Sequence, residues 1–458
     1  MPALSARAAT PPGWALLSTS CGTAVASVCC LGLFAIESLV GGLWAPLAVA
    51  VAGALCLLLS RRVGHLYRVL PSGAGLLAQL SRGLGRRAGL MLVVPYLTLT
   101  LLLVGAEATL CGLLLGAIWP LPTPLWAALF LVGTWALCRA GLHLGQLAQA
   151  LSTAALMLGL GALALALFGE AAAQGQLASR LVRPVPSATA LLAAIGQALF
   201  LFMGFELVTF QAAGGEPQRV RRVLTLSVVL LTGFYALVSL GISCLPVRPD
   251  ASALQRSLIA PQLLLAQRGG RPVVLAVVLL SLLASYTSFN GALLTLSRFT
   301  YALASQGLLP RGLAALDPRT HVPQRALDGL LGFSLLATAV LLGTRALVPV
   351  IVAAAACAAA LYAGVALARE RAPFKDPLRS PARRLVGLGL GALLIGLALG
   401  ALFDLPASAS RSTAVVLVLL AYGAAAALSL RLVRRADRPI ARAAPLPVPE
   451  GDRHAASR

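Results

Sequence analysis

The chain has 458 residues, of which 59% are hydrophobic and only 11% are charged. Soluble globular domains carry about 25% charged residues, so this composition excludes an ordinary soluble protein and predicts a chain that crosses a membrane many times. The formal net charge of +22 comes almost entirely from Arg residues in short clusters between apolar runs, which excludes the single basic face of a nucleic-acid-binding protein.

Apolar runs of about 20 residues, bounded by charge, Pro or Gly, predict twelve membrane-spanning helices. In chain order the predicted spans are 14–36, 42–60, 88–116, 124–142, 146–168, 189–213, 223–245, 272–304, 326–343, 346–368, 385–403 and 412–433. We therefore expect an all-α integral membrane protein.

The Lys and Arg residues divide unequally between alternate loops. Eight of the 36 fall in the loops on one side, which leaves 28 for the opposite loops and the chain ends. Because cytoplasmic loops are enriched in Lys and Arg, both termini are expected to be cytoplasmic, with the Arg clusters contacting the anionic lipids of the inner leaflet. The loop 246–271 is an exception, because its Arg residues lie outside on this topology.

Two of the predicted spans are interrupted by small and polar residues. The first contains Ser18–Val25, with Gly22 at its centre, and the sixth contains Met203–Glu206. Transporters often repeat a bundle of helices in inverted orientation, with a discontinuous helix opening each half. Because the two interruptions are offset by five spans, we expect a 5+5 inverted repeat.

This repeat divides the chain into five parts. They are a cytoplasmic N-terminus at 1–13, a first repeat at 14–168, a second repeat at 189–368, an accessory helix pair at 385–433, and a disordered, basic cytoplasmic tail at 434–458.

Four sequence blocks also point to a known family. They are Leu16–Ser20 with Gly22–Val25; Leu70–Gly75; Phe202–Glu206 with Glu216–Arg219; and Ser288–Leu294 continuing through Ser297 and Arg298 to Gly307–Pro310 and Val322–Pro323. At these residues the chain resembles the amino acid–polyamine–organocation superfamily, and the first block is most similar to methionine and branched-chain amino-acid exporters. The resemblance implies a LeuT-like fold with discontinuous helices 1 and 6. One departure is Ala24, which stands where the family favours a second glycine.

An unwound membrane helix can bind a zwitterion without charged side chains, because its free N–H groups attract a carboxylate and its free C=O groups accept from an ammonium. We place the carboxylate near Gly22–Val25 and the ammonium near Phe202–Gly204. The Ser20 hydroxyl could add a contact, or it could bond to its own backbone. The predicted substrate-binding residues are Ser20, Gly22, Thr23, Ala24, Val25, Phe202, Met203, Gly204, Phe205 and Asn290.

Phe205 matches a family aromatic that closes over the substrate, so the resemblance implies a gate; the alternative is ordinary packing. Glu206 and Glu107 are acids at membrane depth, where charged groups are costly and usually functional. Glu206 could carry a proton, pair with an ammonium, or accept hydrogen bonds from backbone N–H groups that the break leaves unpaired. Glu107 could couple transport to protons or make a fixed hydrogen bond to a neighbouring helix.

The eighth span offers the hydroxyl groups of Ser285, Thr287 and Ser288, which could bind a sodium ion or bond between helices. We expect a proton rather than sodium as the coupling ion. The His and Cys residues lack the spacing of metal ligands, and no hydrolase or metalloprotease motif occurs, so we expect no metal, no cofactor and no enzyme activity.

These patterns predict a secondary active transporter of amino acids in the cell membrane. The residues near both interruptions are mostly apolar, which favours neutral or apolar amino acids moved by alternating access in proton-coupled symport or antiport. The alternatives are a polyamine or organic-cation transporter of the same fold and a membrane protein that transports nothing.

Overall fold

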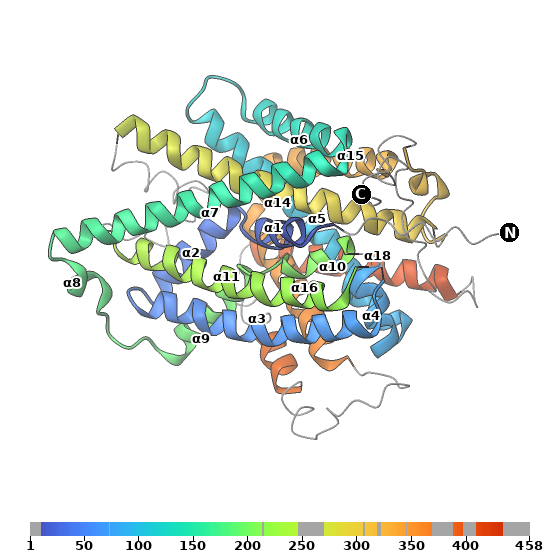
Figure 1. Ribbon diagram of the computed structural model, residues 1–458, viewed down its shortest axis with the longest axis horizontal. Helices are drawn as coiled ribbons and strands as arrows, with labels where there is room; N and C mark the ends of the chain where they lie inside the picture. Colours follow the sequence, from blue (N-terminus) through green and yellow to red (C-terminus); the bar gives the residue numbers. More distant parts are fainter. Residues whose placement is uncertain are drawn as a thin grey trace, which may run out of the picture.

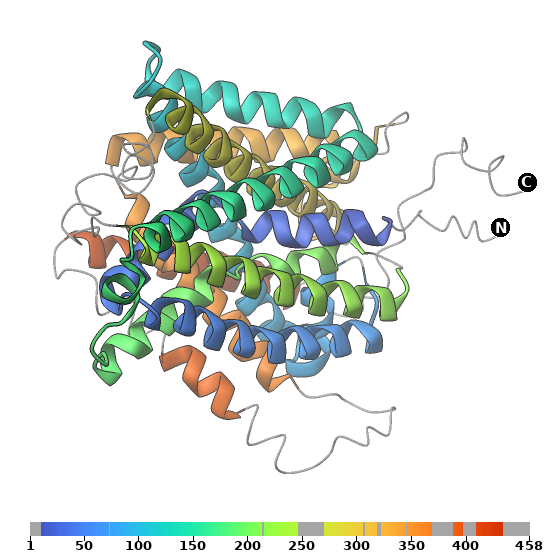
Figure 2. The same cartoon turned by 60° about the vertical axis from the view of Figure 1, so that its left-hand side comes forward.

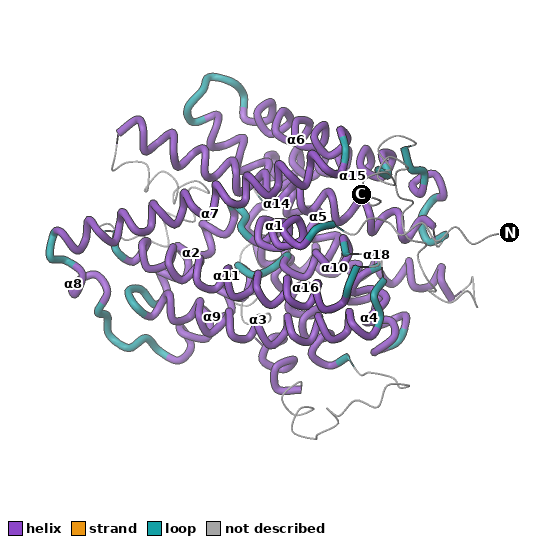
Figure 3. Tube along the Cα trace, in the orientation of Figure 1, coloured by secondary structure: helices purple, strands orange, loops and turns teal. Residues whose placement is uncertain are grey.

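The computed structural model describes residues 11–72, 74–212, 215–245, 270–305, 307–317, 322–344, 346–368, 388–396 and 409–433. All regular secondary structure within these ranges is helical (Figure 3). The predicted all-α class is therefore confirmed.

The helices, in chain order, are α1 (Gly13–Ala24), α2 (Val28–Leu39), α3 (Trp44–Val69), α4 (Gly75–Leu84), α5 (Arg86–Gly116), α6 (Thr123–Ala140), α7 (Leu142–Ala173), α8 (Leu177–Leu181), α9 (Ala188–Phe200), the 3₁₀ helix η1 (Phe205–Leu207), α10 (Val208–Gln211), α11 (Pro217–Ser243), α14 (Gly270–Ser305), the 3₁₀ helix η2 (Arg311–Ala314), α15 (Gln324–Thr344), α16 (Leu347–Leu367) and α18 (Ala409–Val433). Residues 388–396 are also helical. The axes of most of the long helices are roughly aligned (Figure 2).

The described residues contain ten helices that are long and apolar enough to cross a membrane, and the bent pair α1 and α2 makes an eleventh span. These spans correspond to eleven of the twelve predicted ones. The remaining span, 385–403, is described only at 388–396. The predicted tail at 434–458, most of the N-terminal segment 1–13 and nearly all of the loop 246–271 lie outside the described residues.

Large apolar side chains cover the outside of the helix bundle. On α7, Leu151, Leu158 and Leu165 are seven residues apart and are 64%, 74% and 57% exposed. Such a stripe would be unfavourable in water but suits contact with lipid tails. The spans and this surface identify a multi-pass membrane protein.

Both predicted helix interruptions are present. The first separates α1 from α2, whose axes differ by 55°. The second separates α9 from η1 and α10, and Gly204 lies within it at a φ of 108°. Only glycine adopts this backbone conformation without steric cost, so Gly204 allows the chain to turn here.

The α1 helix lies at the centre of the bundle (Figure 1). It packs against α7, α11 and α14. Within this core, small residues let helices approach closely, as is common in membrane proteins. On α11, a Cβ at Gly241 would lie 2.7 Å from the Cα atom of Ala164 on α7, so this crossing has no room for a side chain.

We predict that Gly241→Ala destabilises the protein by about 1 to 3 kcal/mol, because the added methyl group would push α11 away from the α7 backbone. Thermal unfolding of the purified protein in detergent measures the effect. The control is Gly233→Ala on the same helix, where a Cβ meets no atom within 4 Å. It should leave stability unchanged or raise it, since alanine favours helices. Equal melting temperatures for the two variants would contradict the close contact.

Candidate functional site

A cavity lies between the two helix breaks. Its walls come from α1 and α2, α5, α9 and the following break, η1 and α14. The predicted site residues that line it are Thr23, Ala24, Met203, Gly204, Glu107 and Ser288. Residues of both interrupted helices therefore meet at one place, as expected of paired breaks.

Side chains from other helices form hydrogen bonds with the backbone groups on both sides of the first break. The last carbonyl of α1, on Ala24, accepts a hydrogen bond of 2.7 Å from the Tyr235 hydroxyl of α11. The first N–H groups of the second half, on Ser27 and Val28, donate to the two carboxylate oxygens of Glu107 at 3.1 and 3.0 Å. A carboxylate at a helix N-terminus is electrostatically favourable, so Glu107 caps α2.

Glu107 is 1% exposed and has a third donor. The Ser285 hydroxyl of α14 donates to its Oε2 atom at 2.7 Å. Three donors from two other elements therefore hold this carboxylate, so it makes the fixed contacts to neighbouring helices that were one of its two sequence-based alternatives.

The first break lies later in the chain than the sequence suggested. The predicted anion donors Gly22, Thr23 and Ala24 are inside α1, and the Val25 N–H donates to the carbonyl of Cys21 at 2.9 Å. The reason is packing: a Cβ at Gly22 would collide with the side chains of Gln149 and Thr153 on α7. Gly22 therefore allows α1 to approach α7 and does not unwind it.

The second break is held by two tyrosines that the sequence analysis did not single out. Glu206 is fully buried, and its carboxylate accepts hydrogen bonds from the hydroxyl groups of Tyr96 on α5 and Tyr362 on α16, the latter at 2.9 Å. These bonds connect the broken helix to two others. A tyrosine inside an apolar span needs a partner for its hydroxyl, which is the sequence signal that could have identified the pair.

The predicted aromatic residues pack beside the cavity but do not line it. The ring of Phe205 contacts Tyr362 with centroids 6.1 Å apart, and Phe202 meets Tyr235 edge-on at 5.8 Å. Both phenylalanines are fully buried. In this conformation their side chains contribute to packing around the second break.

Two hydroxyl groups of α1 join the two breaks directly. Thr23 donates to the Gly204 carbonyl at 3.1 Å, and Ser20 donates to the Phe205 carbonyl at 2.9 Å. These bonds use carbonyl groups of the second break, where the ammonium was predicted to bind. Any movement of one broken helix therefore acts on the other.

The remaining predicted polar residues on α14 have different partners. The Asn290 amide donates to Gln149 at 2.7 Å and to the Gly145 carbonyl at 3.1 Å, so it connects α14 to α7 away from the cavity. The Thr287 hydroxyl donates to the Ala284 carbonyl of its own helix at 3.0 Å. Ser288 alone of these residues faces the cavity.

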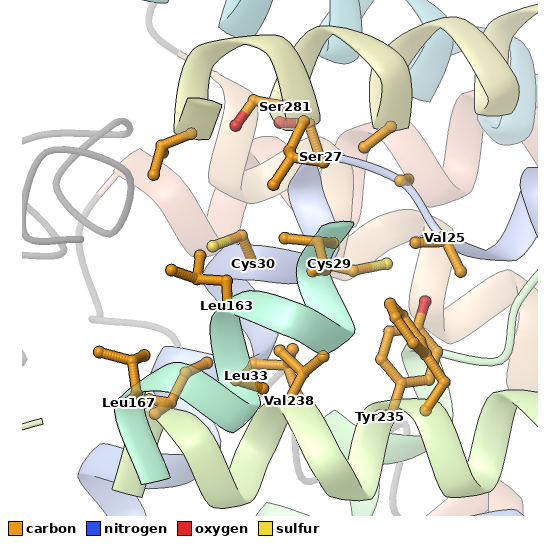
Figure 4. Close-up of a pocket in the computed structure, with 18 residues that line it drawn as sticks. Val25, Ser27, Cys29, Cys30, Leu33, Leu163, Leu167, Tyr235, Val238 and Ser281 are labelled. Atoms are coloured by element: carbon orange, nitrogen blue, oxygen red, sulfur yellow. The ribbon is translucent and has the colours of Figure 1, made fainter. Parts of the chain in front are cut away.

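A second pocket lies on the other face of the first break (Figure 4). Its lining is mostly aliphatic and includes Leu33 of α2, Leu163 of α7 and Val238 of α11. Ala26 and Cys29 line both the pocket and the cavity, so these two residues form a wall between an almost wholly apolar pocket and a cavity that also offers a few polar groups.

The far end of the broken helix is closed by contacts around α10. Arg298 of α14 donates to the Gln211 carbonyl at 2.7 Å, and the Tyr67 hydroxyl of α3 donates to the Ala212 carbonyl. The Phe210 ring occupies the space that a Cβ would take at Gly75, next to α4. The short helix α10 is therefore fixed on three sides.

All eight cysteines are free, and seven of them are buried, as expected of small apolar packing residues. Among the described residues, no group of three His, Cys, Asp or Glu side chains is placed to hold a metal ion.

Comparison with solved structures identifies the fold. The Eremococcus coleocola manganese transporter superimposes with a TM-score of 0.59 and 14% identity, covering 95% of this chain and 99% of that one. A Na⁺-coupled sialic acid symporter superimposes with a TM-score of 0.51 and 12% identity, covering 87% of this chain and 91% of that one. At these identities the likeness establishes the shared transporter fold alone.

Comparison with known sequences identifies the family. The "Probable GABA permease" of Pseudomonas aeruginosa is 27% identical over 310 residues, and the match spans 62% of each chain. The match therefore covers less than two thirds of that relative's length. The family model described as "Amino acid permease" matches residues 16–368, which include both helix breaks and every residue that lines the cavity. The chain belongs to the amino acid permease family.

Proposed function

We propose that this permease is a secondary active transporter that moves amino acids across the cell membrane by alternating access, with both termini in the cytoplasm. The observation that carries the proposal is the cavity enclosed by two broken helices that are hydrogen-bonded to each other. Broken helices at the centre of a bundle are where transporters bind substrates. The family membership and the relative named as a GABA permease support an amino acid as the substrate.

The substrate is a neutral amino acid with an apolar side chain. The cavity offers a few polar groups, among them Thr23, Thr100 and Ser288, for the polar end of a zwitterion. The pocket beyond Ala26 and Cys29 has a mostly aliphatic lining, which suits an aliphatic side chain. Small-molecule sites typically combine such an apolar lining with a few well-placed polar groups.

The coupling ion is a proton. Glu107 is buried in the cavity wall, where a carboxylate can gain and lose a proton as the protein changes conformation. Sodium would require several convergent oxygens, but of the three candidate hydroxyl groups on α14 only that of Ser288 lines the cavity. Glu206 has an architectural role, because both of its oxygens accept from tyrosines.

The two broken spans open two repeats of inverted orientation, at 14–168 and 189–368, with 385–433 as an accessory pair. Rocking one repeat against the other would expose the cavity to each side in turn. The contacts that fix α10 would have to break in that movement, with Phe205 as a moving part that closes over the substrate.

One observation favours a second candidate. Among the described residues that line the cavity, Glu107 is the only one with an acidic or basic side chain. A lone carboxylate attracts a cation, so an organic amine or polyamine is the alternative substrate of the same fold.

We predict that proteoliposomes containing the purified protein accumulate at least one of leucine, methionine and GABA. An inward proton gradient should raise the uptake several-fold, and an inward sodium gradient should leave it unchanged. Radiolabel uptake in empty liposomes is the control. Absence of flux for all three amino acids would contradict the proposal, and uptake of putrescine alone would establish the amine alternative.

We also predict that Tyr362→Phe lowers the stability of the protein by about 1 to 3 kcal/mol, because Glu206 would lose one of its two phenol donors. Thermal unfolding in detergent measures this loss, and the proton dependence of uptake should persist. The matched control is Tyr286→Phe, since the buried Tyr286 hydroxyl has no hydrogen-bond partner among the described residues. If the two variants were equally stable, the architectural role of Glu206 would be disproved.

A further inference from the structure

The start of α2 forms a cradle that is built to hold a carboxylate. Its donors are the N–H groups of Ser27 and Val28 and the hydroxyl of Ser285, which we call the three-donor cradle. Glu107 reaches it from α5, about one turn beyond Val104 in the same wall of the cavity. A side chain 80 residues away in the sequence thus supplies the negative charge that the break requires.

No other backbone N–H group described in the first break is free for a substrate carboxylate. The Val25 N–H donates to Cys21, the Ala26 N–H to Ala24, and the Cys29 N–H back to Ala26. The three-donor cradle is therefore the position in this break where a carboxylate is bound through backbone N–H groups. It is already filled by a carboxylate.

Two ionised carboxylates cannot share this cradle. Like charges a few ångströms apart in a buried site repel strongly, so one of them must be neutral or leave. Among the described residues, no Lys, Arg or His accompanies Glu107 in the cavity wall to compensate a second negative charge. The titratable groups that face Glu107 are Cys29 of α2, Cys111 of its own helix and Tyr235 of α11.

We propose that Glu107 is a tethered competitor of the substrate, and that it yields the three-donor cradle to the substrate's own carboxylate when it is protonated. This inference rests on the proposed amino-acid transport and adds how substrate and proton are linked. One proton from the water on the loading side binds the Glu107 carboxylate and gives a neutral acid. The neutral acid loses its charge-assisted hydrogen bonds to the cradle, and the substrate carboxylate forms them instead.

Release reverses these steps. When the substrate leaves on the other side, Glu107 gives its proton to the water there and its carboxylate returns to Ser27, Val28 and Ser285. The break is thus capped by a negative charge both with and without substrate. One proton moves with each substrate molecule, so the exchange produces symport.

The experiment measures binding to the purified protein in detergent across a range of pH. The probes are leucine, methionine and GABA, each paired with the amine that lacks its carboxyl group. For an amino acid we expect the dissociation constant to rise by up to tenfold per pH unit once Glu107 ionises, because one proton is exchanged. The paired amine should not become weaker as the pH rises, since it does not compete for the cradle.

Glu107→Gln removes the charge and with it the pH dependence. In this variant the dissociation constant of the amino acid should change less than about twofold over the same range, and at high pH it should be at least about tenfold lower than in the wild type.

The matched control is Glu37→Gln. Glu37 is a 7% exposed acid that also accepts from a backbone N–H, on Gly42, and from a serine hydroxyl, on Ser243, but it lines neither the cavity nor the pocket. The pH dependence should be retained in this variant.

The outcomes separate this inference from the proposed function. If an amino acid binds and its pH dependence persists unchanged in Glu107→Gln, the competition is disproved while transport of amino acids stands. If none of the three amino acids binds at any pH, the proposed function fails and the inference fails with it. If Glu107→Gln does not fold, the comparison of amino acid with amine in the wild type decides, and parallel pH dependence of the two would disprove the competition.

Discussion

The hydrogen bonds from the Ser27 and Val28 N–H groups to Glu107 are the interaction on which this architecture depends. A helix that stops in the middle of a membrane leaves backbone groups that no water can satisfy, and each unpaired group is costly. Glu107 accepts from the N–H groups on one side of the break, and Tyr235 donates to the Ala24 carbonyl on the other. Because both ends are satisfied by side chains, α1 and α2 can meet at 55° in the core of the bundle.

The second break is stabilised by different means, and the two buried acids lie in different environments. Gly204 makes the turn, and Tyr96 and Tyr362 hold Glu206 from two helices. Glu206 is enclosed by phenols and does not line the cavity, whereas Glu107 forms part of the cavity wall. We therefore propose that Glu107 exchanges with a substrate group and that Glu206 supports the second break.

The spans could be predicted from the sequence because the bilayer demands apolar runs of fixed length. Gly204 and Glu206 likewise marked the second break correctly. The first break was predicted a few residues too early. In a sequence, a glycine that unwinds a helix cannot be told from one that lets a neighbouring helix pack closely, and Gly22 is of the second kind, since it allows α1 to approach α7. The partners of Glu107 could not be predicted either, since the pattern of apolar and polar residues along the chain does not show which helices lie side by side. The contact between α5 and the start of α2 is a property of the packed bundle.

The most direct test is an experimental structure of the protein with a transported amino acid bound at acidic pH. We predict that the substrate carboxylate lies within hydrogen-bond distance of the Ser27 and Val28 N–H groups and that the Glu107 carboxyl has moved out of the cradle. A bound amino acid with Glu107 still on both N–H groups would contradict it.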